Sequence, residues 1–350
     1  MFSSQKARRA ALRQRILSVS TPTFEDLALA VFQYQAEYNS LYASYLNHLR
    51  RNPAHVQSLD EIPFLPISFF KTRSVRTWQE PGGLTFASSG TTGPATSRHT
   101  VPDLPLYDAV CQRLFEATYG PLAGFHILAL LPSYLERNNS SLVYMVQRFM
   151  ALSGSAASGF FLNNHAALTA RLRELAGPLG GGRRVLLMGV TFGLLDWVEQ
   201  SPATLDWLGE CPGLVVMETG GMKGRRREWL REEVHAELTV RLGVGAIHSE
   251  YGMTELLSQA YSVGEGVFRP GATLQVRLRD LNDPFQTYAP GHTAARQTGG
   301  VNVIDLANLD SCAFVETQDL GQYVGTEGAF RVIGRFDNAD IRGCNLLVSL

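Results

Sequence analysis

The chain has 350 residues, 45% of them hydrophobic, which is enough apolar material to bury a large core. Its 31 Lys and Arg balance 32 Asp and Glu, so no bulk attraction to nucleic acid or to an anionic membrane is expected. No apolar run reaches the roughly 18 residues that span a bilayer, and stable membrane insertion is not expected. The basic amino terminus lacks the apolar region of a secretory signal, and the cysteines form no CxxC pair, which predicts a cytoplasmic protein without a zinc site.

The first seventy residues predict helices followed by an extended segment. Residues 1–16 are basic and predict a helix whose charged face is solvated. Apolar and aromatic side chains recur at steps of three and four over residues 24–50, which predicts one amphipathic helix packed on the core. The prolines within residues 62–67 predict an extended connector. Lys71 is expected in a salt bridge or in solvent, and a role facing a carboxylate stays open.

Three apolar runs predict buried strands of an α/β sheet, at residues 125–131, 184–190 and 213–217. The third run ends in a Gly-rich turn and precedes a helix with one apolar stripe, a layout typical of nucleotide sites. The stripe consists of Leu230, Val234, Leu238 and Leu242, and the basic cluster 225–227 before it is expected to be solvated. From about Gly266 onward, alternating polar and apolar residues predict a β-rich subdomain.

A Ser/Thr/Gly loop follows an apolar segment near residue 87. Its small residues let backbone amides approach a polyphosphate while the hydroxyls donate to phosphate oxygens, although a plain polar turn has the same composition. The lysine of an ordinary P-loop is missing, which excludes that class of NTPase. The loop consists of Ser88, Ser89, Gly90, Thr91, Thr92 and Gly93.

A second motif, His-Ser-Glu-Tyr-Gly-Met-Thr-Glu at residues 248–255, makes the pattern specific. Together with the Ser/Thr/Gly loop it resembles the adenylate-forming superfamily of acyl-CoA synthetases, adenylation domains and luciferases. The resemblance implies that Tyr251 and Gly252 line the adenine pocket, that Thr254 contacts phosphate and that Glu255 binds Mg²⁺. An aromatic face suits a purine and a carboxylate suits Mg²⁺. The alternative is that Tyr251 belongs to the core and that Glu255 is a charge at a helix start.

Three further segments match motifs of that superfamily, and two of them lie downstream in its usual order. Thr-Gln-Asp at residues 317–319 resembles the motif whose aspartate holds the ribose hydroxyls, and Gly-Arg-Phe-Asp at 334–337 resembles the one whose arginine faces the nucleotide. The resemblance therefore implies that Asp319 and Arg335 bind ATP, with Gln318 standing where a glycine is commoner. The third segment, implied to present backbone atoms to the adenine edge, consists of Glu218, Thr219, Gly220 and Gly221.

Ordinary members carry a further lid domain of roughly a hundred residues after these motifs, and the resemblance predicts a large domain over residues 1–334 without that lid. Residues 335–350 are expected to form a short tail. Its segment 340–348, together with the segments 62–71 and 131–142, resembles the acyl-protein synthetase (LuxE-type) family. In that family a carboxyl-terminal cysteine accepts the acyl group, and Cys344 matches it. A lone cysteine is otherwise commonly an inert small hydrophobe.

The predicted function is ATP- and Mg²⁺-dependent activation of a carboxylic acid, a fatty acid by resemblance, and transfer of the acyl group to a protein cysteine. Expected partners are the small-molecule acid and an acyl reductase or acyl-acceptor protein. A short acyl-CoA ligase of the phenylacetate type and a non-catalytic nucleotide- or acyl-binding protein are the alternatives. Apolar residues that serve an acyl pocket or the core equally well are Phe160, Phe161, Phe192, Leu194 and Met253.

Overall fold

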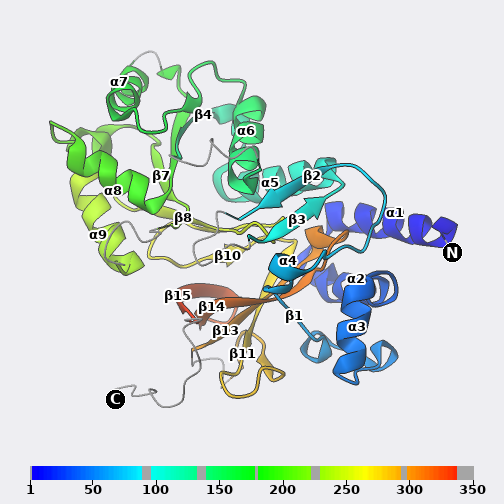
Figure 1. Ribbon diagram of the computed structural model, residues 1–350. Helices are drawn as coiled ribbons and strands as arrows, with labels where there is room; N and C mark the ends of the chain where they lie inside the picture. The colour runs from blue at the N-terminus through cyan, green and yellow to red at the C-terminus, as the bar shows by residue number, and fades with distance from the viewer. Residues whose placement is uncertain are drawn as a thin grey trace.

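A seven-stranded sheet, a six-stranded sheet and a small hairpin organise the molecule, with the amino-terminal helices packed at the side of the six-stranded sheet (Figure 1). The computed structural model describes residues 2–88, 96–131, 139–177, 180–221, 229–292 and 298–336. Within those ranges no helix is both long and apolar enough to cross a membrane.

The seven-stranded sheet has the order β10-β9-β8-β7-β6-β4-β5, and the strands from β8 to β5 are mutually parallel. All three strands predicted from apolar runs are confirmed as β4, β6 and β7, because such runs suit a strand that is buried on both faces. The strands are β4 (Phe125–Leu130), β5 (Gly159–Phe160), β6 (Arg184–Gly189), β7 (Val215–Glu218), β8 (His248–Tyr251), β9 (Ala260–Ser262) and β10 (Arg269–Pro270).

Helices cover both faces of this sheet, as expected for parallel strands joined by helical crossovers. Side chains alternate between the faces, so that Ile127 packs toward α5 and α6 and Leu128 toward α7, α8 and α9. The predicted stripe on α9 is confirmed except at Leu230, which precedes the helix and is 62% exposed. The helices are α5 (Leu104–Tyr119), α6 (Ser141–Ser153), α7 (His165–Ala176), α8 (Thr191–Gln200) and α9 (Arg231–Leu242).

The six-stranded sheet forms the predicted β-rich subdomain. Its antiparallel strands β11, β13, β14 and β15 bury an apolar face, while the extended segment predicted at residues 62–67 supplies the parallel edge strand β1. The strands are β1 (Leu65–Pro66), β11 (Leu274–Arg279), β12 (Thr287–Tyr288), β13 (Gly299–Asp305), β14 (Phe314–Val324) and β15 (Ala329–Arg335). The hairpin consists of β2 (Leu84–Ala87) and β3 (Arg98–Val101), which flank the predicted phosphate loop.

The single helix predicted over residues 24–50 is wrong: two helices, α2 (Phe24–Tyr38) and α3 (Ser40–His48), meet at Asn39. Asn39 is extended and buried, and its side chain caps α3 by accepting from the Tyr42 amide while it donates to the Ser311 carbonyl. The break turns Tyr42 into the core in place of Leu41. One further short helix is α4 (Phe69–Thr72), and 3₁₀ turns span Thr21–Thr23, Pro53–His55, Leu59–Glu61, Leu122–Gly124, Asp206–Glu210 and Leu306–Asn308.

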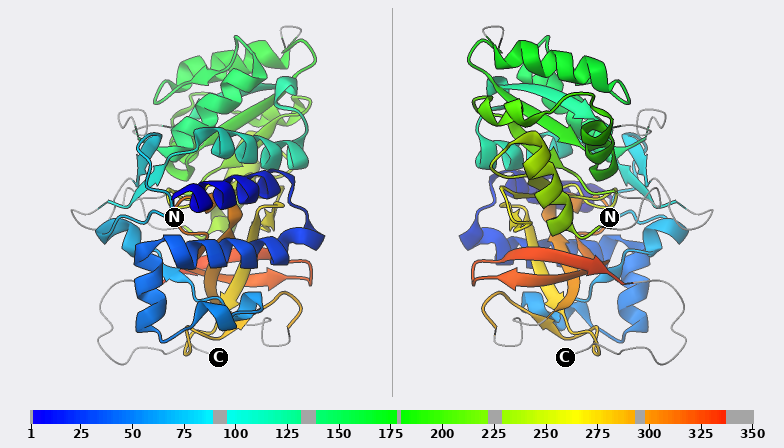
Figure 2. Two further views of the ribbon diagram at one scale, coloured as in Figure 1. Left: turned by 90° about the vertical axis from the view of Figure 1, so that its right-hand side faces the viewer. Right: turned by 90° about the vertical axis from the view of Figure 1, so that its left-hand side faces the viewer.

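The first helix, α1 (Phe2–Ser18), is confirmed, but its predicted solvated face is wrong where it meets the core. Arg9 donates two hydrogen bonds of 2.6 Å to Asp310, and both Arg9 and Arg13 pair with Asp103. The Arg9 side chain is 16% exposed and lies over the Trp78 ring. Figure 2 shows α1 and α2 running side by side across this part of the molecule. These ion pairs therefore attach α1 to Asp103, at the start of α5, and to Asp310, between β13 and β14.

Candidate active site

The motifs that the sequence singled out come together where β8 ends. The Tyr251 hydroxyl donates to an Asp319 carboxylate oxygen at 2.8 Å, and Arg335 Nε lies 3.1 Å from the other oxygen. Burial raises the pKa of Asp319, and the nearby Arg335 and Tyr251 offset part of that rise. Burial and the neighbouring carboxylate also raise the pKa of Tyr251, which keeps its hydroxyl protonated. The structure thus joins residues from three separate motifs in one cluster.

Gly252 follows, at a point where a side chain would press on the Glu250 carboxyl. A Cβ built there would lie 2.2 Å from the Glu250 Oε1 atom, so a larger residue would displace that buried carboxyl. Burial, followed by the charge of Glu218, raises the pKa of Glu250 to about 8, so this group is mostly protonated at neutral pH. Gly252 itself is exposed, and its place beside adenine stays a prediction from the resemblance.

Glu255 lies in the turn after β8 and is 6% exposed. Burial raises the pKa of its carboxyl, while a hydrogen bond from the Ser97 side chain and the charges of Arg335 and Lys71 lower it. Lys71 is exposed on α4, as one of its two expected positions required, and its charge acts on Glu255 only as a minor influence; a role facing a substrate carboxylate stays a prediction. Because Glu255 is buried in this turn, it is not a charge at a helix start.

The predicted phosphate loop is described only at its base. Ser88 and Ser97 exchange hydrogen bonds: the Ser88 amide donates to the Ser97 carbonyl and the Ser97 amide to the Ser88 hydroxyl, both at 3.0 Å. Ser97 also bonds the Glu255 carboxyl, which places the base of the loop beside the turn after β8. Five of the predicted loop residues lie outside the described residues, namely Ser89, Gly90, Thr91, Thr92 and Gly93.

The segment 218–221 is fixed by hydrogen bonds to the Glu218 side chain as well as by the backbone of its glycines. The Glu218 carboxylate is buried and accepts hydrogen bonds from Ser249, the Gly220 amide, Thr191 and Arg231. The Gly220 and Gly221 carbonyls accept from the first amides of α8, and both residues have the positive φ that favours glycine. Thr219 donates its amide to the Gly189 carbonyl. The buried Glu218 side chain therefore supports this turn from within the protein.

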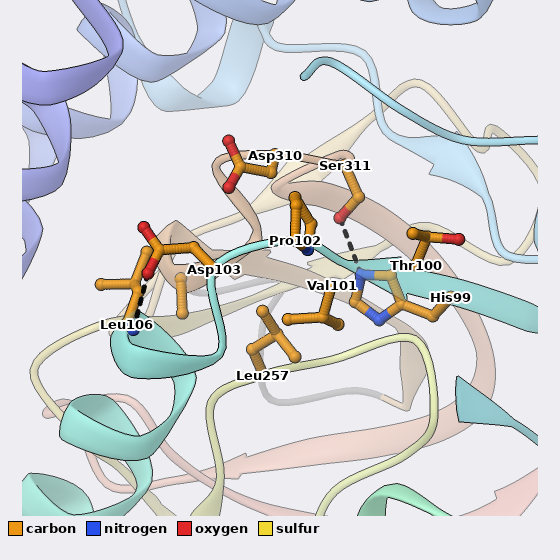
Figure 3. A pocket seen from close by; sticks show the side chains of 10 residues that line it. His99, Thr100, Val101, Pro102, Asp103, Leu106, Leu257, Asp310 and Ser311 are labelled. Atoms are coloured by element: carbon orange, nitrogen blue, oxygen red, sulfur yellow. Dashed lines mark hydrogen bonds between the residues drawn. The ribbon is translucent and has the colours of Figure 1, made fainter. Parts of the chain in front are cut away.

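His99 is a buried residue that sequence reasoning missed. Its Nδ1 atom lies 2.9 Å from the Thr254 carbonyl oxygen, and its Nε2 atom lies 2.9 Å from the Ser311 hydroxyl (Figure 3). Burial lowers the pKa of His99 to about 4, against the opposing effect of the Thr254 bond. The one sequence signal that could have pointed to His99 is its position six residues after Gly93. That spacing does not indicate a contact with Thr254.

The cavity beside His99 is too small to be a substrate pocket. It measures about 10 Å³, which is room for one water, and it lies between β3, the start of α5 and the Asp310–Ser311 segment (Figure 3). The five residues proposed for an acyl pocket do not share one face of the sheet either. Leu194 and Phe161 pack in the cluster under α7 to α9, whereas Phe192, Phe160 and Met253 pack on the other side.

The residues of the site that the structure describes are compatible with Mg²⁺, but they do not form a site in which protein side chains supply every metal ligand. Among the described residues no three His, Cys, Asp or Glu side chains gather as a metal site. Mg²⁺ commonly takes one or two carboxylates and completes its coordination with substrate phosphates and water. Glu255 offers one hard oxygen donor beside the base of the predicted phosphate loop, and a bound cation would offset the burial of its charge.

The predicted nucleophile, Cys344, lies outside the described residues, as do the cluster 225–227, Asp337 and most of the segment 131–142. The remaining cysteines are poor nucleophiles. Burial raises the pKa of Cys111 and of Cys312 to about 12, and it raises the pKa of Cys211 as well.

No family model and no curated protein matches the sequence. Among solved structures, the chain resembles a 2-hydroxyisobutyryl-CoA ligase in complex with 2-HIB-AMP and CoA, with 13% identity over 95% of this chain and 69% of that one and a TM-score of 0.59. Lower TM-scores accompany a structure from a study of fatty acyl-adenylate ligases of E. coli and L. pneumophila (0.45; 13% identity, 96% of this chain and 73% of that one). They also accompany a mutant coronafacic acid ligase from Pectobacterium brasiliense (0.43; 16% identity, 66% of this chain and 43% of that one).

The last two likenesses have TM-scores below 0.5, and the chain spans less than half the length of the coronafacic acid ligase. The hydroxyisobutyryl-CoA ligase, in contrast, matches 95% of this chain with a TM-score above 0.5. At 13% sequence identity, this structural similarity is evidence for the fold alone. The chain has the α/β fold of the adenylate-forming ligases, with a β-rich subdomain beside the parallel sheet.

Proposed function

We propose that the protein binds ATP with Mg²⁺ and activates a carboxylic acid as an acyl-adenylate. The observation that carries this proposal is the cluster of Tyr251, Asp319 and Arg335, which sits beside the buried Glu255 at the carboxyl end of β8. In open α/β sheets, ligands bind at the carboxyl ends of parallel strands. The resemblance of the sequence to the adenylate-forming superfamily supports the proposal as well, because it implies nucleotide- and Mg²⁺-binding roles for these same residues.

In this proposal each residue of the cluster has a distinct part. Tyr251 offers a ring face to adenine, and its hydroxyl fixes the Asp319 carboxylate, whose remaining lone pairs accept from the ribose hydroxyls. The Arg335 side chain is 67% exposed, so it can leave Asp319 at little cost and pair with a phosphate. Magnesium, when bound, would be held by Glu255 and would neutralise phosphate charge.

The reaction then needs little chemistry from the protein beyond placement and charge. An oxygen of the substrate carboxylate attacks the α-phosphorus of ATP, the bond to the bridging oxygen of the β-phosphate breaks, and pyrophosphate leaves with the electron pair. Arg335 and the amides of residues 88–93 would face the charge that develops on the phosphates. The products are acyl-AMP and pyrophosphate.

We further propose that the acid is fatty and that its acyl group passes to the Cys344 thiol. The support is the resemblance to acyl-protein synthetases, together with the raised pKa values of Cys111, Cys211 and Cys312. The Cys344 thiolate would attack the acyl carbonyl carbon, and AMP would leave as the thioester forms. An acyl reductase or another acyl-acceptor protein would take the group from there.

Cys344→Ser should keep acid-dependent exchange of pyrophosphate into ATP but lose acyl label that hydroxylamine releases from the protein. A serine hydroxyl is far less ionised than a thiol near neutral pH, so only the second step fails. The measurement is radiolabelled fatty acid on denatured protein, with Cys211→Ser as the control that should retain the label. Label surviving in the Cys344 variant would overturn the assignment of this cysteine.

Two other functions are separated by the same assays. A short acyl-CoA ligase would release AMP only when coenzyme A is present and would leave no label on the protein. A non-catalytic binding protein would bind ATP yet exchange no pyrophosphate with any acid. A screen over fatty, aromatic and amino acids therefore tests the adenylation step and the acyl class together.

A further inference from the structure

His99 connects two parts of the candidate site that are far apart in the sequence. It stands in β3, on the hairpin that flanks the predicted phosphate loop, and it contacts the turn after β8 through the Thr254 carbonyl. A carbonyl oxygen only accepts, so the hydrogen must lie on Nδ1 of the ring. The Nε2 atom is then an acceptor, and the Ser311 hydroxyl donates to it.

Ser311 is itself a fixed point. Its carbonyl accepts from the Asn39 side chain at 2.8 Å and from the Thr77 hydroxyl, and the adjoining Asp310 is clamped by Arg9 of α1. In Figure 3 the Ser311 hydroxyl points at the His99 ring. The Ser311 hydroxyl therefore fixes the Nε2 side of the His99 ring, and the Nδ1 side binds the turn after β8 through the Thr254 carbonyl.

The turn has other restraints on both sides of Glu255, among them the Leu256 amide, which donates to the Met253 carbonyl, and the Ser258 amide, which donates to Asp305. The Asn308 side chain holds the Glu255 carbonyl at 2.8 Å, and the Leu257 amide donates to Asp305. Among the described residues no side chain besides His99 hydrogen-bonds the Thr254 carbonyl. Ser97, two residues before His99, reaches the Glu255 carboxyl from the same hairpin. The hairpin thus grips the turn at two adjacent points.

We propose that His99 is a positioning residue which sets the Glu255 carboxylate at a fixed place relative to the β2–β3 hairpin. The proposal rests on the proposed function for its consequence, since the carboxylate matters there as the ligand of Mg²⁺–ATP. The structural part of the proposal is that the hydrogen bond between His99 and the Thr254 carbonyl orders the turn. This part can be tested without measuring any activity.

Two amide variants separate the two ring nitrogens. The Asn side-chain NH₂ can occupy the place of Nδ1, so His99→Asn keeps a donor to Thr254, whereas the Gln NH₂ falls near Nε2, so His99→Gln keeps only the contact to Ser311. Both variants bury an amide in place of the ring, and a general loss of packing affects both. Ser311→Ala leaves the ring but removes the donor to Nε2 as an independent variant.

The first measurement is hydrogen exchange of peptides covering residues 252–258 in protein without nucleotide. We expect faster exchange in His99→Gln and an intermediate rate in Ser311→Ala, with His99→Asn close to wild type. The second is binding of Mn²⁺ in the presence of ATP, followed by electron paramagnetic resonance. We expect affinity about tenfold weaker in His99→Gln than in His99→Asn, in the range found when the partner of a metal ligand is lost.

The outcomes keep the two ideas apart. Equal exchange rates in His99→Asn, His99→Gln and wild type would overturn the positioning role even if the protein adenylates acids normally. Faster exchange in His99→Gln would support that role even if wild-type protein binds no Mn²⁺ with ATP, and this last result would count against the proposed function alone. Weaker Mn²⁺ binding in His99→Gln, with normal binding in His99→Asn, supports both.

Discussion

Glu255→Gln should abolish acid-dependent pyrophosphate exchange, by at least about a hundredfold, while the protein stays folded. The change removes one negative charge and almost no volume from the turn after β8, so the loss falls on the magnesium site; changing only an outer partner of a metal ligand costs 10- to about 100-fold. Because burial raises the pKa of this carboxyl, its ionised form destabilises the fold at neutral pH, and the amide should leave stability unchanged or higher.

The measurement pairs exchange rates over a range of Mg²⁺ concentrations with thermal unfolding of the same preparations. Glu116→Gln is a matched control, since this carboxylate is half-buried on α5 and accepts from the Leu122 amide far from the cluster. Normal exchange with normal magnesium dependence in Glu255→Gln would show that Glu255 is no ligand. A variant that unfolds would instead show that the carboxyl is needed for the turn itself.

Glu218→Gln should lower the free energy of unfolding at pH 7 by about 3 kcal/mol, because it leaves Arg231 without its buried counter-charge. Burial alone would raise the pKa of Glu218, but His235, Arg231, Ser249 and the Gly220 amide outweigh it and lower the pKa to about 2. A depressed pKa contributes stability above the unfolded value of 4.5, and that contribution is lost as pH falls toward 2.

Chemical denaturation at pH 7 and at pH 3 measures this difference between wild type and variant, which should shrink at the lower pH. Glu232→Gln serves as the control, since this glutamate is exposed in the first turn of α9 and should change stability by no more than about 0.5 kcal/mol. A gap between wild type and Glu218→Gln that is equally large at both pH values would contradict the assigned cause.

Much of the fold follows from patterns that are local in the sequence. The apolar runs of β4, β6 and β7 and the alternating strands after Gly266 depend on burial within one element, and each is found as predicted. The grouping of Tyr251 with Asp319 and Arg335 was accessible only through resemblance, because no spacing rule relates residues so far apart.

What local patterns missed depends on partners distant in the chain. The helix break at Asn39 is fixed by Ser311, and the arginines of α1 are drawn from solvent by Asp310 and Asp103. His99 gains its meaning only from a contact with Thr254. The sequence named Glu218 only as part of the segment implied to present backbone atoms to adenine, and it missed the hydrogen-bonding partners of the side chain, which come from three other elements, α8, α9 and β8. The domain boundary at residue 334 and the part played by Cys344 remain predictions.

The central claim, activation of an acid as its adenylate, is tested most directly by oxygen transfer. The acid that best supports pyrophosphate exchange is labelled with ¹⁸O in its carboxyl group and incubated with ATP, Mg²⁺ and a thiol acceptor or hydroxylamine. Attack of the carboxylate on the α-phosphorus places one ¹⁸O atom in each AMP released, which mass spectrometry of the nucleotide detects. AMP without label would contradict the account, and so would label in inorganic phosphate accompanied by ADP.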